Sequence, residues 1–218
     1  MTDLKNVPQP RDMKISDLDD VNEVHKKCFS ASVSIFSALS SDILKLYYRM
    51  FIDEPESYAV VLEDQASGRV VGVVIGTGNP GIQDRFLKKY RTRFFWDILK
   101  GLFSRKAVWD ALVARFGKRN SFSLGKYEPA LAAIGVPAPK GPENINMEIA
   151  LHPDFRGKGN AARLLEFYNK RVFEDGAVRT RGQVLASNIA SATFFKRQGW
   201  TFLKISDTQF SIWFDRPN

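Results

Sequence analysis

Residues 151–166 read LHPDFRGKGNAARLLE, a glycine-punctuated turn between an apolar strand and an amphipathic helix. Before the turn, apolar and polar residues alternate until Pro153, and the apolar positions are Ile145, Met147, Ile149 and Leu151. This period of two predicts a strand with one buried face. After Gly159, apolar residues recur at helical spacing, at Ala161, Leu164, Leu165, Tyr168 and Val172. The sequence therefore predicts a strand, a turn and a helix in succession.

The turn itself predicts a binding site for a phosphate or pyrophosphate. Gly157 and Gly159 lie at the expected helix N-terminus, where free backbone N–H groups and the helix dipole favour an anion. Arg156 and Lys158 add positive charge beside them. The spacing matches neither G-x-x-x-x-G-K-S/T nor G-x-G-x-x-G, which argues against a P-loop or a Rossmann motif. Glycine-rich turns also begin many helices that bind no ligand, and that alternative stays open here.

Two segments resemble the GNAT superfamily of acyl-CoA-dependent N-acyltransferases. The signature of that superfamily is Arg or Gln, two residues, Gly, one residue, then Gly or Ala, and Arg156, Gly159 and Ala161 match it. A second segment, VLASNIASATFFKRQGW at residues 184–200, is similar to the strand, Asn-led helix and Gly-aromatic stop that end the GNAT core. The resemblance covers residues 145–214 well and residues 13–77 more weakly, and it is absent between them.

The resemblance implies acetyl-CoA as the cosubstrate and assigns residues to it. The strand before the turn would splay from its neighbour, and Leu151 would lie near the thioester. Asn188 would contact the pantetheine arm, although an Asn before a helix is also a common N-cap. Phe195 would face CoA where many members have a Tyr that protonates the leaving thiolate. The residues expected on the pyrophosphate are Arg156, Gly157, Lys158, Gly159, Asn160 and Ala161.

The resemblance also implies direct attack of the amine on the thioester in a ternary complex. Glu148, on the cofactor strand, is the acidic residue best placed to take a proton from the amine, although it could instead pair with a surface Lys. His152 is a second candidate, placed beside the phosphate turn. Cys28 is far in sequence from every motif, so a covalent route is not expected. Neither His has metal-ligand spacing, and no metal is expected.

Composition predicts a soluble protein with one domain over residues 1–218. A hydrophobic content of 44% and a charged content of 26% are typical of globular proteins. The single cysteine, Cys28, suits a reducing compartment. The polar N-terminus has no apolar signal region, and no apolar run approaches the length of a membrane span. A cytoplasmic location is expected, with peripheral membrane association left open.

The remaining segments predict an α/β fold of GNAT type, a mixed but mostly antiparallel central sheet with helices on both faces. Residues 13–15 are interpreted as a first strand. A helix starting at Ser16 or Asp17 turns Leu18, Val21, Val24, His25 and Phe29 inward, with His25 assigned to packing or the surface. A second helix follows Ser41 or Asp42. A hairpin pairs residues 58–63 with 70–77, and later strands are expected at 180–186, 201–205 and 209–215.

A basic helical insertion is predicted at about residues 78–144, before the cofactor strand. Its apolar spacing indicates two amphipathic helices, one through Phe86 to Leu102 and one through Val108 to Phe116. From Asp84 to Lys126 the sequence has twelve basic and three acidic residues, a net charge of +9, whereas the whole chain has a net charge of +8. A lipid phosphate or membrane surface, the pyrophosphate of a sugar nucleotide, the phosphates of CoA or a nucleic acid would suit this charge, and a solvated positive face is the structural alternative.

These observations predict an N-acetyltransferase that transfers an acetyl or short acyl group from acyl-CoA to a primary amine. The acceptor is expected to be an amino sugar or another anionic small molecule, through a weaker resemblance to GNAT members associated with sugar modification. Two alternatives stay open, a non-catalytic CoA-binding or membrane-docking module and a protein N-acetyltransferase. Nucleic acid is not an expected partner, and a homo-oligomer is left open.

Overall fold

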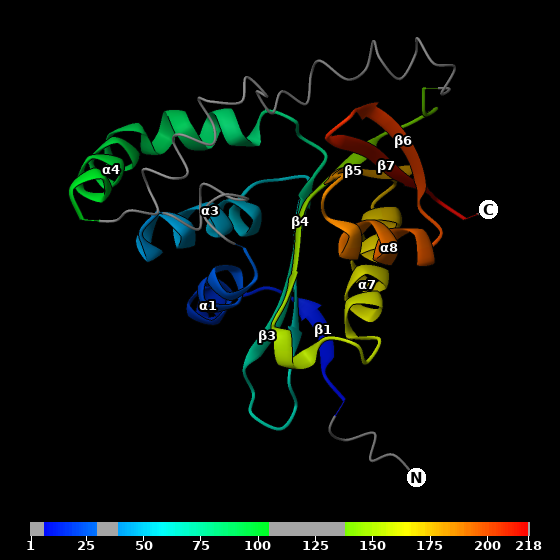
Figure 1. Cartoon of the computed structure of the whole chain (residues 1–218), viewed down its shortest axis with the longest axis horizontal. Helices are drawn as coiled ribbons and strands as arrows, with labels where there is room; N and C mark the ends of the chain where they lie inside the picture. Colours follow the sequence, from blue (N-terminus) through cyan, green and yellow to red (C-terminus); the bar gives the residue numbers. More distant parts are fainter. Residues whose placement is uncertain (1–6, 30–38, 105–137, 218) are drawn as a thin grey trace.

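The computed structural model of the chain describes residues 7–29, 39–104 and 138–217. Within these residues, seven strands form one sheet in the order β1-β2-β3-β4-β5-β7-β6 (Figure 1). All neighbouring strands are antiparallel except β4 and β5, which are parallel. The strands are β1 (Gln9–Asp12), β2 (Ser57–Glu63), β3 (Val70–Thr77), β4 (Glu143–Leu151), β5 (Arg179–Leu185), β6 (Thr201–Ser206) and β7 (Gln209–Asp215). The predicted mixed, mostly antiparallel sheet is confirmed.

Helices cover both faces of the sheet, as predicted (Figure 1). One face carries α1 (Leu18–Cys28), α3 (Ser41–Asp53) and α4 (Ile82–Ser104), and the other carries α7 (Asn160–Glu174) and α8 (Ile189–Arg197). Each face has its own apolar core, with Tyr48 and Phe51 among the fully buried side chains on the first and Leu164 and Tyr168 on the second. Burying each such side chain contributes about 1.5–3 kcal/mol. The sheet is therefore held between the two layers of helices by an apolar core on each face.

The first strand lies earlier than the sequence predicted. Strand β1 spans Gln9–Asp12, whereas Met13 enters the core and a 3-10 turn, η2, begins at Ile15. Strand β1 pairs only with β2, at the edge of the sheet. An edge strand tolerates Pro10 and needs few apolar residues, so it leaves a weak signal in the sequence. The prediction of a strand at residues 13–15 was therefore wrong.

A bulge in β4 decides which way its side chains point. Ile75 of β3 lies opposite Glu148, but the next residue, Gly76, lies opposite Asn146, so Met147 is an extra residue. Beyond the bulge, Ile149 packs toward α7, whereas Met147 packs toward α1 and α3. The uninterrupted alternation predicted for this strand is wrong at Met147. Because of the bulge, Glu148 faces α1 and α3.

Strands β4 and β5 separate after a short parallel pairing. Residues Glu143, Asn144 and Ile145 pair with Arg179, Thr180 and Arg181, and neither strand pairs with the other beyond that point. Strand β4 continues to Leu151 and β5 to Leu185. The splay that the resemblance implied is therefore present, and it opens toward the turn after Leu151.

The described part of the insertion forms one long helix, α4. It is interrupted at Tyr90, whose backbone angles are not helical, so the helix is kinked there. Phe86 packs against Tyr47 of α3 with ring centroids 5.5 Å apart, and Tyr90, Phe94 and Ile98 are partly buried on the same core. The first of the two predicted helices is confirmed. The second, at residues 108–116, lies outside the described residues.

Candidate functional site

The turn after β4 has the geometry of an anion site. Strand β4 ends at Leu151, a 3-10 turn, η4 (Pro153–Phe155), follows, and α7 begins at Asn160. Gly157 and Gly159 have φ angles of 81° and 73°, a left-handed region that glycine adopts readily. Gly159 is the N-cap of α7 and has no side chain to cap the helix. The first N–H groups of α7 are therefore directed to an exposed turn.

The polar side chains of the turn have different partners. Arg156 and Lys158 are both exposed, but the Arg156 guanidinium turns back toward β4, and its Nε donates to the carbonyl of Leu151 at 3.2 Å. Asn160 is buried, and its Nδ2 donates to the carbonyl of Phe155 at 2.8 Å. Asn160 thus closes the turn with its side chain, and its backbone N–H is the group left to face an anion.

The two predicted CoA-facing residues of the C-terminal segment have different surroundings. Asn188 is exposed and caps α8, with its Oδ1 accepting from the Ser191 N–H at 3.1 Å. Phe195 is buried in the core, with its ring centroid 4.8 Å from that of Trp200. The N-cap alternative for Asn188 is thus present in the structure. A contact of either residue with CoA stays a prediction.

Cys28 is distant in sequence from the turn after β4, but in the structure it lies close to it. Its thiol donates to the carbonyl of Leu151 at 3.1 Å, and a guanidinium nitrogen of Arg156 lies 3.7 Å from the sulfur. Burial raises the pKa of the Cys28 thiol above its usual value, despite the nearby Arg156. Because the thiolate is the nucleophilic form, a thiol kept protonated is poorly suited to a covalent route.

Glu148 lies in a buried hydrogen-bond cluster with His25 and Tyr48. Its Oε1 atom lies 2.8 Å from His25 Nδ1 and accepts a hydrogen bond from the Tyr48 hydroxyl. That hydroxyl also lies 2.8 Å from His25 Nδ1. His25 and Tyr48 are fully buried, whereas 12% of the Glu148 side chain is exposed. The three residues come from α1, α3 and β4, so the tertiary fold brings them together.

The two carboxylate oxygens of Glu148 have different surroundings. Oε1 is held by His25 and Tyr48, whereas Oε2 makes no hydrogen bond within the described part of the chain. Burial raises the pKa of Tyr48 well above its usual value, so its hydroxyl stays protonated and donates to the carboxylate. A carboxylate with one anchored oxygen and one free oxygen is suited to accept a proton.

Sequence reasoning assigns His25 to packing or the surface and gives Tyr48 no role. The packing of His25 is confirmed by its complete burial, but its hydrogen bond to Glu148 was not predicted. The available signal was a polar residue on the apolar face of a helix, beside Val21 and Val24. Such a residue needs a buried partner, and the sequence does not say which one.

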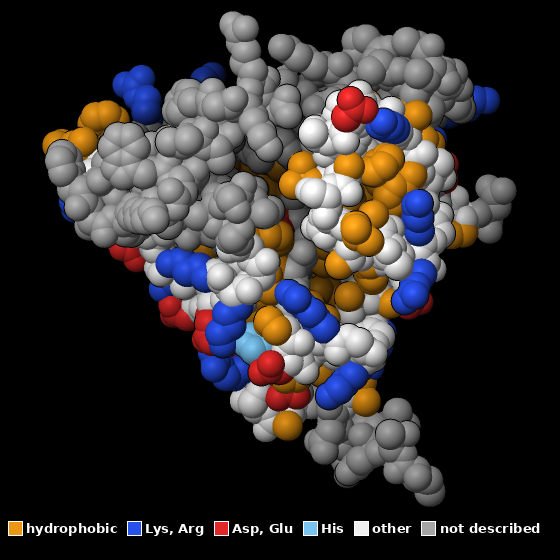
Figure 2. All heavy atoms as spheres, viewed as in Figure 1, with side chains coloured by type: hydrophobic (Ala, Val, Ile, Leu, Met, Phe, Trp, Pro, Cys, Tyr) orange, Lys and Arg blue, Asp and Glu red, His pale blue; other side chains and the backbone are white. Residues whose placement is uncertain are grey.

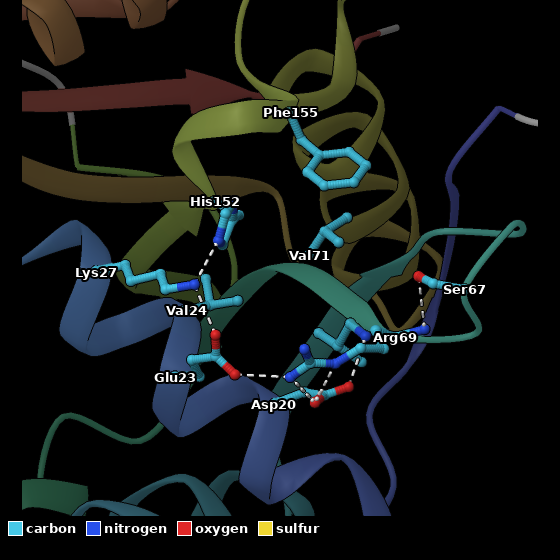
Figure 3. A pocket seen from close by; sticks show the side chains of 10 residues that line it. Asp20, Glu23, Val24, Lys27, Ser67, Arg69, Val71, His152 and Phe155 are labelled. Carbon is cyan, nitrogen blue, oxygen red and sulfur yellow. Dashed lines mark hydrogen bonds and ion pairs between the residues drawn. The ribbon is translucent and has the colours of Figure 1, made fainter.

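Figure 3 shows His152 in an ion network on the α1 side of the turn. Its Nε2 lies 2.9 Å from Lys27 Nζ, and its Nδ1 accepts from the Asp154 N–H at 3.4 Å. Glu23 pairs with both Lys27 and Arg69, at 2.6 Å in each case. The network borders a hollow of about 280 Å³ whose apolar wall consists of Val24, Val70, Val71 and Phe155. Both ring nitrogens of His152 thus face groups of the chain, which favours Glu148 over His152 as a base.

Known proteins share this fold. The chain is similar over nearly its full length to the protein SsHAT, with 18% identity and a TM-score of 0.60, covering 97% of this chain and 100% of that one. The PaiA N-acetyltransferase of Thermoplasma acidophilum, in complex with coenzyme A, has 11% identity and a TM-score of 0.58, with coverage of 96% and 99%. YncA of Salmonella typhimurium, a putative acetyltransferase with acetyl-CoA, has 13% identity and a TM-score of 0.54, with coverage of 97% and 95%.

A search of curated protein sequences finds no match. The model of the acetyltransferase (GNAT) family matches residues 18–200, which include the helices α1 and α3, the splayed strands and the turn before α7. The chain therefore belongs to the acetyltransferase (GNAT) family, a family of acyl-CoA-dependent N-acetyltransferases.

Proposed function

We propose that this protein transfers an acetyl group from acetyl-CoA to a primary amine by direct attack in a ternary complex. The observation that carries the proposal is the position of Glu148. It lies on the splayed strand that leads into the turn proposed to bind phosphate, and one of its carboxylate oxygens makes no hydrogen bond to any described residue. Because Glu148 and the turn belong to the same strand and its end, an amine next to Glu148 would lie close to the thioester of CoA bound at the turn. Bringing these two groups together is the main requirement of this reaction.

The residues of the turn suit the phosphates of CoA. The backbone N–H groups at the start of α7 and the exposed Lys158 would hold the pyrophosphate. Gly157 and Gly159 suit the positive φ angles of the turn, and because they have no side chains the anion can come close to the backbone. Leu151 would lie beside the thioester, with Asn188 and Phe195 along the pantetheine arm. Arg156 would hold the end of β4 through its bond to the Leu151 carbonyl or turn to the pyrophosphate.

The proposed step needs one proton acceptor and no covalent intermediate. The amine nitrogen attacks the thioester carbonyl, its proton passes to Oε2 of Glu148, the C–N bond forms and the C–S bond breaks. Phe195 cannot donate a proton, so CoA leaves as a thiolate or takes a proton from water. Thiols ionise near pH 8.5, which makes a thiolate an acceptable leaving group.

We propose an acceptor that carries a negative charge, such as an amino sugar linked to phosphate. The excess of positive charge between Asp84 and Lys126, twelve basic residues against three acidic ones, supports an anionic acceptor. A cationic polyamine would be repelled by the same residues. A protein amino terminus and a non-catalytic CoA-binding role are the alternatives that the experiment must separate.

The test is release of free thiol from acetyl-CoA in the presence of single amines. The panel would contain amino sugars with and without phosphate, a peptide with a free amino terminus, and spermidine. We expect faster release with the phosphorylated amino sugar than with its neutral counterpart. CoA binding by calorimetry without thiol release for any amine would instead favour the non-catalytic role, and a preference for the peptide would favour a protein N-acetyltransferase.

A further inference from the structure

Helix α4 has an outward face that the described chain leaves uncovered. Phe95 and Trp96 are 60% and 53% exposed, and their rings contact each other with centroids 5.9 Å apart. Leu87, before the kink, is 43% exposed. Three of the six large exposed hydrophobic residues in the described chain therefore lie on this one helix.

The same helix carries positive charge that no carboxylate of the described residues balances. Lys88, Lys89, Arg91 and Arg93 are exposed, and none forms an ion pair with any described residue. The ammonium of Lys89 lies over the Tyr90 ring, 5.5 Å from its centroid. Two exposed cations elsewhere, Arg49 and Arg69, are by contrast paired with the carboxylates of Asp53 and Asp20. The charge on α4 is thus available to an external anion.

Helical geometry separates the covered face of α4 from the exposed one. Successive residues of a helix are turned by about 100°. Beyond the kink at Tyr90, this places Phe94 and Ile98 together on the core side, where both are partly buried. It places Trp96 on the opposite side and Phe95 on the flank next to Ile98, and around the helix both rings lie between Arg91 and Arg93. Figure 2 shows hydrophobic and basic side chains next to each other at the upper left, where α4 lies in Figure 1.

We propose that α4 docks the protein on an anionic membrane surface, an interaction that does not depend on the proposed acetyl transfer. Phe95 and Trp96 insert at the level of the lipid headgroups, and the four cations contact lipid phosphates and carboxylates. Exposed aromatic rings flanked by Lys and Arg fit an interface that is apolar on one side and anionic on the other. Within the described residues, no helix is both long and apolar enough to span a bilayer.

A lipid surface fits these residues better than a nucleic acid does. Phosphates of a nucleic acid would satisfy the cations, and its bases could stack on the two rings, but Leu87 would gain nothing from either contact. The headgroup region of a bilayer accommodates the aliphatic side chain, the rings and the charges together. Binding to nucleic acid is therefore an outcome that the test has to exclude.

The test is cosedimentation of the whole chain with vesicles of phosphatidylcholine alone or with one third phosphatidylserine. We expect binding to the anionic vesicles only, and weaker binding as salt rises. Replacing Lys88, Lys89, Arg91 and Arg93 by Gln should weaken it at least roughly tenfold. A matched control with the same charge change replaces Lys140, Lys170, Arg197 and Arg216, which are exposed outside α4, and it should bind nearly as the original chain does.

The aromatic contribution is tested separately. Phe95→Ala with Trp96→Ala should also weaken vesicle binding, and Trp96→Phe should remove the blue shift of tryptophan fluorescence that anionic vesicles induce. CoA affinity should be unchanged in every variant, which verifies folding. Equal binding to both vesicle types, an equal loss in the matched control, or binding to duplex DNA in preference to anionic vesicles would overturn the proposal. Because neither readout involves acetyl transfer, failure here leaves the proposed function untouched.

Discussion

Glu148 is held at one oxygen by two side chains from separate helices. The hydroxyl of Tyr48 and the Nδ1 atom of His25 both contact Oε1, and both residues are fully buried. A side chain fixed in this way would lose less rotational freedom on binding an amine, which suits the general base proposed for this reaction. Two predictions at the scale of single residues follow from this arrangement.

The first concerns proton acceptance by Glu148. Replacing Glu148 by Gln preserves the shape and the contact with Tyr48 but removes the basic oxygen. We expect kcat to fall by about 10²- to 10⁴-fold, the usual contribution of a general base. Affinity for CoA, measured by calorimetry, should hardly change. If turnover stays at its original value between pH 6 and 9, Glu148 is a structural residue.

The second concerns His25 as a positioning residue, and it rests on the proposed role of Glu148. Asn places an N–H group close to the position of Nδ1, whereas Leu fills the space without a donor. We therefore expect His25→Leu to lower kcat/KM by about tenfold or more, the effect of losing one hydrogen bond to a charged group. His25→Asn should recover most of the activity.

Tyr48→Phe gives an independent readout of the same cluster. Removing the hydroxyl leaves Oε1 of Glu148 held by His25 alone, so kcat should fall while the affinity for CoA stays nearly unchanged. A purely structural role would lower thermal stability without lowering kcat. Equal activities of the Asn and Leu variants at position 25 would also count against the positioning role.

At the scale of elements, the turn before α7 depends on backbone conformation. Gly159 has a φ of 73°, and a Cβ there would meet no atom within 4 Å, so a substitution is strained but not obstructed. Gly176, just after the other end of α7, has a φ of 97° and equally open surroundings. The two glycines differ in position, since only Gly159 adjoins the proposed pyrophosphate site.

This pair of glycines separates binding from stability. Gly159→Val and Gly176→Val should each cost about 1–2 kcal/mol, because a residue with a Cβ is disfavoured at positive φ. For a chain of this length that lowers Tm by roughly 2–8 °C. Only Gly159→Val should also abolish CoA binding in calorimetry, because its branched side chain covers the N–H groups. Similar CoA affinities of the two variants would remove the turn from the cofactor site.

At the scale of the whole molecule, the sheet is continuous only through three residue pairs between β4 and β5. The α1, α3 and α4 side packs on one core, and the α7 and α8 side packs on the other. A ligand that fills the splay and bridges the two strands would bind the folded chain and not the unfolded one. Stability should then increase with ligand concentration.

CoA should therefore raise the stability of the whole chain by about 2.7 kcal/mol at a concentration of one hundred times its Kd. For a protein of this size the increase corresponds to a rise in Tm of roughly 5–10 °C, measurable by calorimetric or fluorescence melting. The Gly159→Val variant serves as the control and should show no rise. An equal rise in that variant would place CoA somewhere other than the turn.

Sequence alone determined the elements that depend on local pattern. The hairpin of β2 and β3, the helices α1, α3 and α7, and the turn at Gly157 and Gly159 were predicted from periodicity and glycine placement, because these signals lie within a few residues of one another. The GNAT resemblance was likewise carried by two contiguous segments, one from Arg156 to Ala161 and one over residues 184–200. These features need no knowledge of distant contacts.

Only the tertiary structure decided what surrounds Glu148 and the strand β4. The bulge at Met147 turns Glu148 toward α1 and α3, and it arises from pairing with β3, which lies some seventy residues earlier. The contacts of Glu148 with His25 and Tyr48, and of Cys28 with Leu151, join residues separated by 100 or more positions. No local pattern records such contacts, because a buried polar side chain shows only that it needs a partner, and the packing of the sheet selects which one.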